Sequence, residues 1–184
     1  MRSFITIFLI SFLMCSSSMK GQDSLEKSYD YKFQAGLCLK KFAGFYWMNG
    51  ISLSYHLKGS PWSHVRTGAV LSSSRLGSAF TSNAIPVHAL ECFAHYSFRD
   101  GKQLQPFLGL NIGYAHANYG NEKYKALPNS QALLSPETGL YLRSKYPISI
   151  AASLGYNLIT GDGTKNLGLI YPLFFQFRFL YVFE

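Results

Sequence analysis

The chain has 184 residues, which suits one domain, and 48% of them are hydrophobic while 14% are charged. After the N-terminus it contains no run of about 18 or more apolar residues, which argues against a helical membrane protein. The formal net charge is +8, but the lysines and arginines are scattered through the sequence, which argues against nucleic-acid binding. If this chain crosses a membrane, it crosses with strands.

The N-terminal segment has the three parts of a secretory signal peptide. A basic start is followed by an apolar run from Phe4 to Met14 and then by small and polar residues. We therefore predict that residues 1–21 are a cleaved export signal and that residues 22–184 form the mature domain. Cys15 would be the lipidated residue of a lipoprotein, but the small residue that normally precedes such a cysteine is missing.

Alternation of apolar and polar residues predicts about eight strands in the mature chain. Successive side chains of a strand point to opposite faces, so a period of two marks a two-faced strand. In the clearest case Ile51, Leu53 and Tyr55 alternate with Ser52 and Ser54. The expected strands are 32–40, 51–58, 62–74, 85–99, 104–118, one ending with 138–143, 148–158 and 167–184. Most are long enough to cross a bilayer when tilted.

Short and long connections alternate between these strands. The short ones are 59–61, 100–103 and 144–147, and the longer or more polar and aromatic ones lie near Trp47, Ser78, Gly120 and Asp162. This asymmetry is typical of a barrel with short periplasmic turns, longer outer loops and both termini in the periplasm. We expect the loops at 45–47, 77–83 and 119–130 to carry any binding specificity. Their candidate residues are Phe45, Tyr46, Trp47, Tyr119, Asn121 and Lys123.

The final strand is the most two-faced of all. One face holds Phe175, Phe177, Phe179, Tyr181 and Phe183, and the opposite face includes Gln176 and Arg178. An ordinary apolar core rejects a buried arginine, whereas a membrane barrel places lipid on one side and a polar lumen on the other. We expect this strand to close the barrel by pairing with 32–40 and 148–158.

The polar faces of the strands are expected to line a lumen only wide enough for side chains. The predicted inward residues are Lys32, Gln34, Lys40, Ser52, His56, His64, Arg66, Glu91, His95, Arg99, Asn111, Glu137, Arg143, Asn157, Gln176 and Arg178. Because buried charges need partners, we predict that Glu91 and Glu137 each pair with one or more of Arg66, Arg143 and Arg178. Such a plugged interior leaves no room for a large diffusion pore.

Two cysteines would remain after the signal is removed, and an exported pair suggests a disulfide. Cys92 shares its phase with Leu90 and Ala94, whereas Cys38 lies on the phase opposite to Leu37 and Leu39. The first would point outward and the second inward, so a bond through the wall is excluded by geometry.

With its two-faced strands, its alternating short and long connections and this final strand, the chain from about Tyr31 to Glu184 resembles the small eight-stranded outer-membrane barrels of Gram-negative bacteria, in the manner of the outer-membrane protein A transmembrane domain. The resemblance implies an all-β fold, a single eight-stranded antiparallel up-and-down transmembrane β-barrel. It also implies a monomer in contact with lipopolysaccharide and inserted by the barrel-assembly machinery, which would read the terminal aromatics Phe179, Tyr181 and Phe183. Glu184 follows the last aromatic and departs from that pattern.

A lipid A-modifying enzyme is one alternative function, since barrels of this size include deacylases and acyltransferases with Ser, His and an acid near the lipid-facing outer rim. His95 and Ser97 share a face, but that face is the interior near a periplasmic turn. His116 and Glu122 have no serine near them in the sequence. No catalytic residue is therefore assigned, and we predict a structural or surface-interaction role.

A soluble exported carrier of the lipocalin type is the other alternative, because it also has eight strands. It would need the apolar faces inside and the charges outside, which is the inverse arrangement. The five histidines are dispersed and do not form a metal site, and no glycine-rich phosphate loop is present, so we expect no metal and no cofactor.

Overall fold

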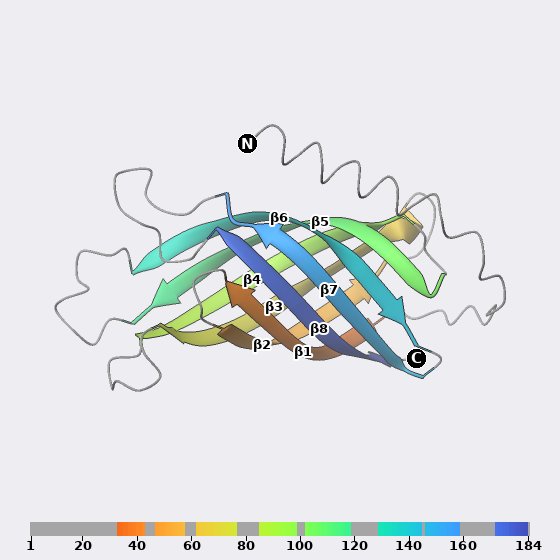
Figure 1. Cartoon of the computed structure of the whole chain (residues 1–184), viewed down its shortest axis with the longest axis horizontal. Coiled ribbons are helices and arrows are strands. Elements are labelled where there is room, and N and C mark those ends of the chain that lie inside the picture. The colour runs from red at the N-terminus through yellow and green to blue at the C-terminus, as the bar shows by residue number, and fades with distance from the viewer. Residues whose placement is uncertain are drawn as a thin grey trace.

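A computed structural model gives the fold and describes residues 33–42, 47–57, 62–76, 85–98, 102–118, 129–144, 146–158 and 172–183. Its strands are β1 (Phe33–Phe42), β2 (Trp47–His56), β3 (Val65–Leu76), β4 (Ile85–Ser97), β5 (Leu104–Ala117), β6 (Ser130–Arg143), β7 (Ile148–Tyr156) and β8 (Leu173–Phe183), with a short 3-10 helix, η1 (Trp62–His64), before β3. Neighbouring strands pair in sequence order and form a closed barrel (Figure 1). The predicted fold class is confirmed.

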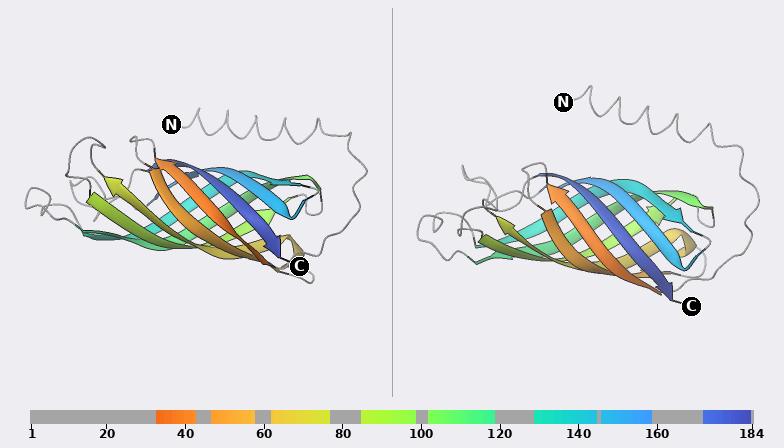
Figure 2. Two further views of the ribbon diagram at one scale, coloured as in Figure 1. Left: turned by 90° about the horizontal axis from the view of Figure 1, so that it is seen from below. Right: turned by 60° about the horizontal axis from the view of Figure 1, so that its bottom comes forward.

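Closure depends on the final strand. β8 pairs antiparallel with β1 from Phe33↔Phe183 to Phe42↔Phe174, and on its other edge it pairs with β7. Figure 2 shows β1 and β8 side by side in both views. Exposed and buried residues alternate without interruption along β8, as the sequence predicted. Because β8 is paired on both edges, no strand edge is left open. A membrane-spanning sheet must be closed in this way, since lipid cannot hydrogen-bond to unpaired backbone groups.

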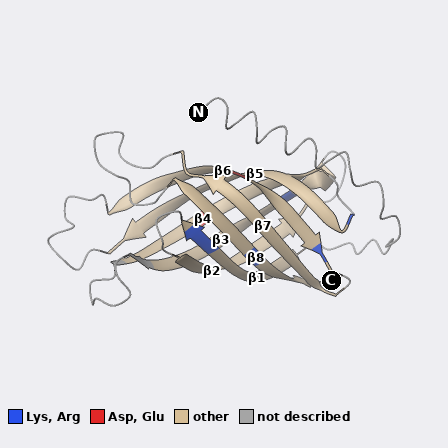
Figure 3. Cartoon of the chain, viewed as in Figure 1, with Lys and Arg blue, Asp and Glu red and all other residues tan. Residues whose placement is uncertain are grey.

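The outside of the barrel is apolar. Its exposed side chains include Leu37, Leu71 and Ile112, which are 62%, 58% and 58% exposed, whereas Arg178 is 2% exposed inside. Lys, Arg, Asp and Glu occupy little of the barrel ribbon in Figure 3. Apolar residues outside and charges inside are the pattern of a transmembrane barrel and the inverse of a lipocalin. Among the described residues, no helix has the length and apolar character needed to cross a membrane.

Strand ends differ from the prediction where local alternation breaks down. Trp47 was expected in a loop, but it is the first residue of β2 and pairs with Lys41 of β1. The sequence Asn49-Gly50 hides this extension, because neither residue marks an apolar face. The start of β6 at Ser130 likewise falls inside the loop predicted to run through 130. The predicted start of the last strand, at 167, lies outside the described residues. Pairing with a neighbour, rather than local pattern, sets these ends.

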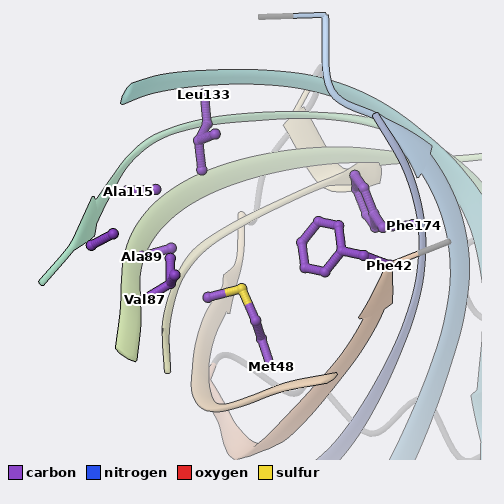
Figure 4. Close-up of a cluster of buried hydrophobic side chains, with 8 residues drawn as sticks. Phe42, Met48, Val87, Ala89, Ala115, Leu133 and Phe174 are labelled. Atoms are coloured by element: carbon purple, nitrogen blue, oxygen red, sulfur yellow. The ribbon is translucent and has the colours of Figure 1, made fainter. Parts of the chain in front are cut away.

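The two ends of the barrel can be told apart by their connections. We call the end joined by 43–46, 77–84, 119–128 and 159–171 the loop end, and the opposite end, where β8 finishes, the turn end. Inside the loop end lies an apolar cluster, most of which is labelled in Figure 4. Its members are Phe42, Met48, Val87, Ala89, Ala115, Ala117, Leu133 and Phe174. The predicted polar interior is therefore incomplete for this section of the lumen, where the apolar cluster lies beside buried polar residues such as Ser72, Ser74 and Gln131.

Candidate functional site

The centre of the lumen holds a buried charge cluster that joins three strands which are not neighbours. Arg178 of β8 donates from Nη2 to Oε1 of Glu137 of β6 at 2.9 Å. His95 of β4 contacts the same carboxylate through Nε2. Arg178 Nη1 also lies 3.4 Å from the His95 ring nitrogens. Because β4, β6 and β8 come from different parts of the wall, these contacts cross the lumen.

Polar and aromatic neighbours contact the remaining hydrogen-bond donors and acceptors of this cluster. Ser153 donates to Oε2 of Glu137 at 3.1 Å. With its amide oxygen turned toward the guanidinium, Gln176 accepts from Arg178 Nε and Nη2 at 2.5 and 2.7 Å. The guanidinium carbon of Arg178 lies 4.2 Å from the centre of the Phe93 ring. A buried ion pair is stable only when its remaining donors and acceptors are met in this way.

A stack of rings fills the lumen beside the cluster. His95 lies between Phe93 and Phe107, with ring centroids 4.5 and 4.4 Å away and interplanar angles of 25° and 21°. Its Nδ1 is 2.7 Å from the hydroxyl of Tyr141. Gly109 makes this stack possible, since a Cβ there would lie 2.3 Å from Cδ2 of His95. The stack and the ion pair together hold opposite walls against each other.

A second ion pair lies nearer the loop end. Lys40 Nζ donates to both carboxylate oxygens of Glu91, at 2.6 and 2.7 Å. The same ammonium group lies 4.2 Å from the centre of the Phe174 ring, which belongs to the apolar cluster. A Cβ at Gly113 would approach Cγ of Glu91 within 2.8 Å, so the glycine leaves room for that carboxylate. This pair separates the apolar loop end from the central charges.

Solved structures show the same architecture. The outer membrane protein OprG from Pseudomonas aeruginosa aligns over 84% of this chain and 95% of its own length, with a TM-score of 0.53 and 13% identity. The N-terminal β-barrel domain of Pseudomonas aeruginosa OprF aligns over 83% and 96%, with a TM-score of 0.50 and 17% identity. The fold is that of the small outer-membrane β-barrels. Neisserial surface protein A aligns over 82% and 92%, with a TM-score of 0.49 and 15% identity. No protein-family model and no curated protein matches the sequence.

Within this outer-membrane barrel fold, the predicted charge network is only partly brought together. Glu137 lies against Arg178, both of which the network included. The prediction that an arginine pairs with Glu91 is wrong, because Lys40 takes that place. Arg66 lies near the turn end, with its guanidinium carbon 3.9 Å from the centre of the Tyr141 ring. Arg143, the last residue of β6, is half-buried at the same end.

Alternation predicts which wall face a side chain occupies, but not its height in the lumen. The position of a side chain along the barrel axis depends on the pairing register. In this register Cys38 is the partner of Arg178, so Lys40, two residues further along β1, lies closer to the loop end.

The predicted opposition of the cysteines agrees with the structure, in which Cys38 is buried, Cys92 is exposed and both are free. Phe179, Tyr181 and Phe183 lie exposed on the outside of β8, and their recognition by an assembly machinery stays a prediction.

Several predicted residues lie outside the described part of the chain. They are Lys32, Phe45, Tyr46, Arg99, Tyr119, Asn121, Glu122, Lys123 and Glu184. Of the candidate loop residues, Trp47 alone is described, and the Lys41 ammonium group lies 5.1 Å from its ring centre. The signal peptide at 1–21 also falls outside the described ranges. No group of three or more His, Cys, Asp or Glu residues that could hold a metal occurs within the described ranges.

A serine–histidine contact that sequence reasoning missed lies on the outer surface at the loop end. Nδ1 of His116 is 2.9 Å from Oγ of Ser130, and the two residues are direct partners across β5 and β6. His88 of β4 is the partner of His116 on its other side. The serine was assigned to a loop in the sequence, so only the register brings it to the histidine. His95, in contrast, is buried with both ring nitrogens in contact, and Ser97 is buried near it.

Proposed function

We propose that this protein is a monomeric outer-membrane barrel that anchors surface-exposed loops and does not conduct solutes. The observation that carries the proposal is the set of contacts among Glu137, Arg178 and His95, which cross the lumen while each residue is at most 3% exposed. The apolar outer surface and the likeness to outer-membrane barrels support a location in that membrane. The loops would then be the part free to meet a partner.

Passage of a solute would require breaking this cluster. Removing one partner of a buried ion pair costs roughly 3–5 kcal/mol, so thermal opening of the central section is rare. The stacked rings and the apolar cluster at the loop end add further layers that a hydrated ion would have to cross. The lumen is therefore suited to holding the wall rigid under the loops.

Conductance in planar bilayers tests the closed lumen. Wild-type protein is expected to give no steady current, and a double variant, Glu137→Ala with Arg178→Ala, should leak more than the wild type because the contacts of the central cluster are gone. Ser153→Ala is the matched control, since it removes a neutral donor to the same carboxylate and leaves the ion pair. A steady current through the wild-type protein would sink the proposal.

Location is tested separately by membrane fractionation with heat-modifiability on gels. The folded protein should occur in the outer-membrane fraction and run faster before boiling than after it. A periplasmic soluble protein without a heat-modifiable band would instead support the lipocalin-type carrier. Protease digestion of intact cells should cut within the predicted loops 77–83 or 119–130 and leave the barrel protected.

Hydrolysis or transfer of an acyl ester of outer-leaflet lipid is a second candidate function, favoured by the contact between Ser130 and His116. A hydroxyl hydrogen-bonded to an imidazole is the minimum arrangement for an activated nucleophile. His116 is exposed on the face that lipid would cover. Mass spectra of lipid A from cells with the wild type should then show a changed acyl count that Ser130→Ala abolishes. Ser73→Ala, on the same outer face, is the control, and identical spectra in all cells would refute an enzyme.

A further inference from the structure

The described interior has one more buried cation than buried carboxylates, apart from histidine. Lys40, Arg66 and Arg178 are each 2% exposed, and Glu91 and Glu137 are each 3% exposed. Lys40 pairs with Glu91 at 2.6 Å and Arg178 pairs with Glu137 at 2.9 Å. Three cations less two carboxylates leaves one positive charge, and the side chain that carries it is Arg66.

The surroundings of Arg66 leave part of its guanidinium unsatisfied. Nη2 donates to Oε1 of Gln105 at 3.5 Å, the long limit for a hydrogen bond, and one face of the group packs over the Tyr141 ring at 3.9 Å. Within the described residues, Nε and Nη1 have no hydrogen-bond partner. These two nitrogens carry three N–H donors. The register places Arg66 beside His56 of β2 and His95 of β4, which are not anionic side chains.

A buried and partly unpaired guanidinium at Arg66 lowers the stability of the folded protein unless a counter-charge lies beside it. An arginine cannot relieve the cost of burial by losing its proton, as a lysine can. The ring face of Tyr141 offsets part of the charge, but it offers nothing to the N–H groups at the edge of the guanidinium plane. Buried donors are almost always paired, and a buried charge is normally matched by an opposite one.

We propose that Arg66 binds a small inorganic anion, chloride in the first instance, inside the turn end of the barrel. One excess charge calls for a monovalent ion, and a lumen filled by side chains admits a small one. The ion would accept from Nε or Nη1 and lie on the turn-end side of the ring stack formed by Phe93, His95 and Phe107. This site is separate from both ion pairs and does not depend on whether the loops bind a partner.

Chloride-35 NMR on the refolded full chain in detergent micelles tests the site directly. Exchange between free and bound chloride broadens the resonance, so wild type should show excess linewidth over empty micelles. Arg66→Gln should lose that excess, and it is expected to fold because its removal leaves no carboxylate unpaired. Lys41→Gln makes the same charge change on an exposed lysine outside the lumen and should behave as the wild type.

Thermal unfolding gives an independent readout. At constant ionic strength, exchange of gluconate for chloride should raise the unfolding midpoint of wild type and of Lys41→Gln, because a ligand that binds only the folded state stabilises it. The midpoint of Arg66→Gln should not respond. Equal broadening and equal midpoint shifts for wild type and Arg66→Gln would overturn the proposal and indicate that water alone meets Arg66.

Discussion

Neutralising Glu137 tests the energetics of the central cluster most sharply. The carboxylate accepts from Arg178 at 2.9 Å and from Ser153 at 3.1 Å, and it contacts His95. Glu137→Gln keeps the size of the side chain but leaves the Arg178 guanidinium buried without its counter-charge. Loss of one partner of a buried pair costs roughly 3–5 kcal/mol of unfolding free energy. Ser153→Ala removes only a neutral donor and is expected to cost about 1 kcal/mol.

Urea unfolding of the refolded barrel in micelles or vesicles, followed by the loss of the heat-modifiable band, measures both changes. The double variant Glu137→Gln with Arg178→Met should recover most of the loss, because removal of both charges leaves neither one stranded. A Glu137→Gln variant as stable as wild type would refute the reasoning. So would a double variant that is no more stable than Glu137→Gln alone.

Three further predictions concern side chains on the outer face of the barrel and in its lumen. Ile112→Arg places a charge on the lipid face and should lower stability in vesicles by roughly 2–4 kcal/mol, measured by urea unfolding; an unchanged midpoint would place this face away from lipid. Gly109→Val drives a side chain into His95, and since its Cβ alone would lie 2.3 Å from Cδ2, a loss of roughly 1–3 kcal/mol is expected by the same assay. A lipid-soluble maleimide should modify Cys92 in the folded barrel and Cys38 only after unfolding, as mass spectrometry can show; early modification of Cys38 would contradict its inward position.

Most of the architecture could be predicted from the sequence because a strand has a period of two. The alternation of aromatic residues with Gln176 and Arg178 assigned the two faces of β8, and burial follows that alternation. β4 ends at Ser97 and β5 begins at Leu104, on either side of the predicted turn at Asp100-Gly101, which itself lies outside the described residues. The same pattern placed Cys38 and Cys92 on opposite faces of the wall.

The contacts within the lumen could not be predicted in the same way. Alternation predicts which face of the wall a side chain occupies. Its contact partner across the lumen depends instead on strand tilt and register, and these bring Lys40 rather than an arginine to Glu91. The contact of Ser130 with His116 was missed for the same reason. The apolar cluster inside the loop end was missed because Phe42, Met48 and Phe174 lie at strand ends, where too few residues remain for a period to be visible.

Tryptophan quenching by brominated lipids tests the inside-out arrangement most directly. In a background with Trp47→Phe and Trp62→Phe, a single tryptophan is introduced by Phe179→Trp on the outer face of β8 or by Phe107→Trp in the lumen, where Phe107 is fully buried. Vesicles with bromine atoms on the acyl chains should quench the fluorescence of the Phe179→Trp variant strongly and that of the Phe107→Trp variant little. Equal quenching of the two variants, or stronger quenching of Phe107→Trp, would contradict a barrel that faces lipid with its aromatic side and seals its charges within.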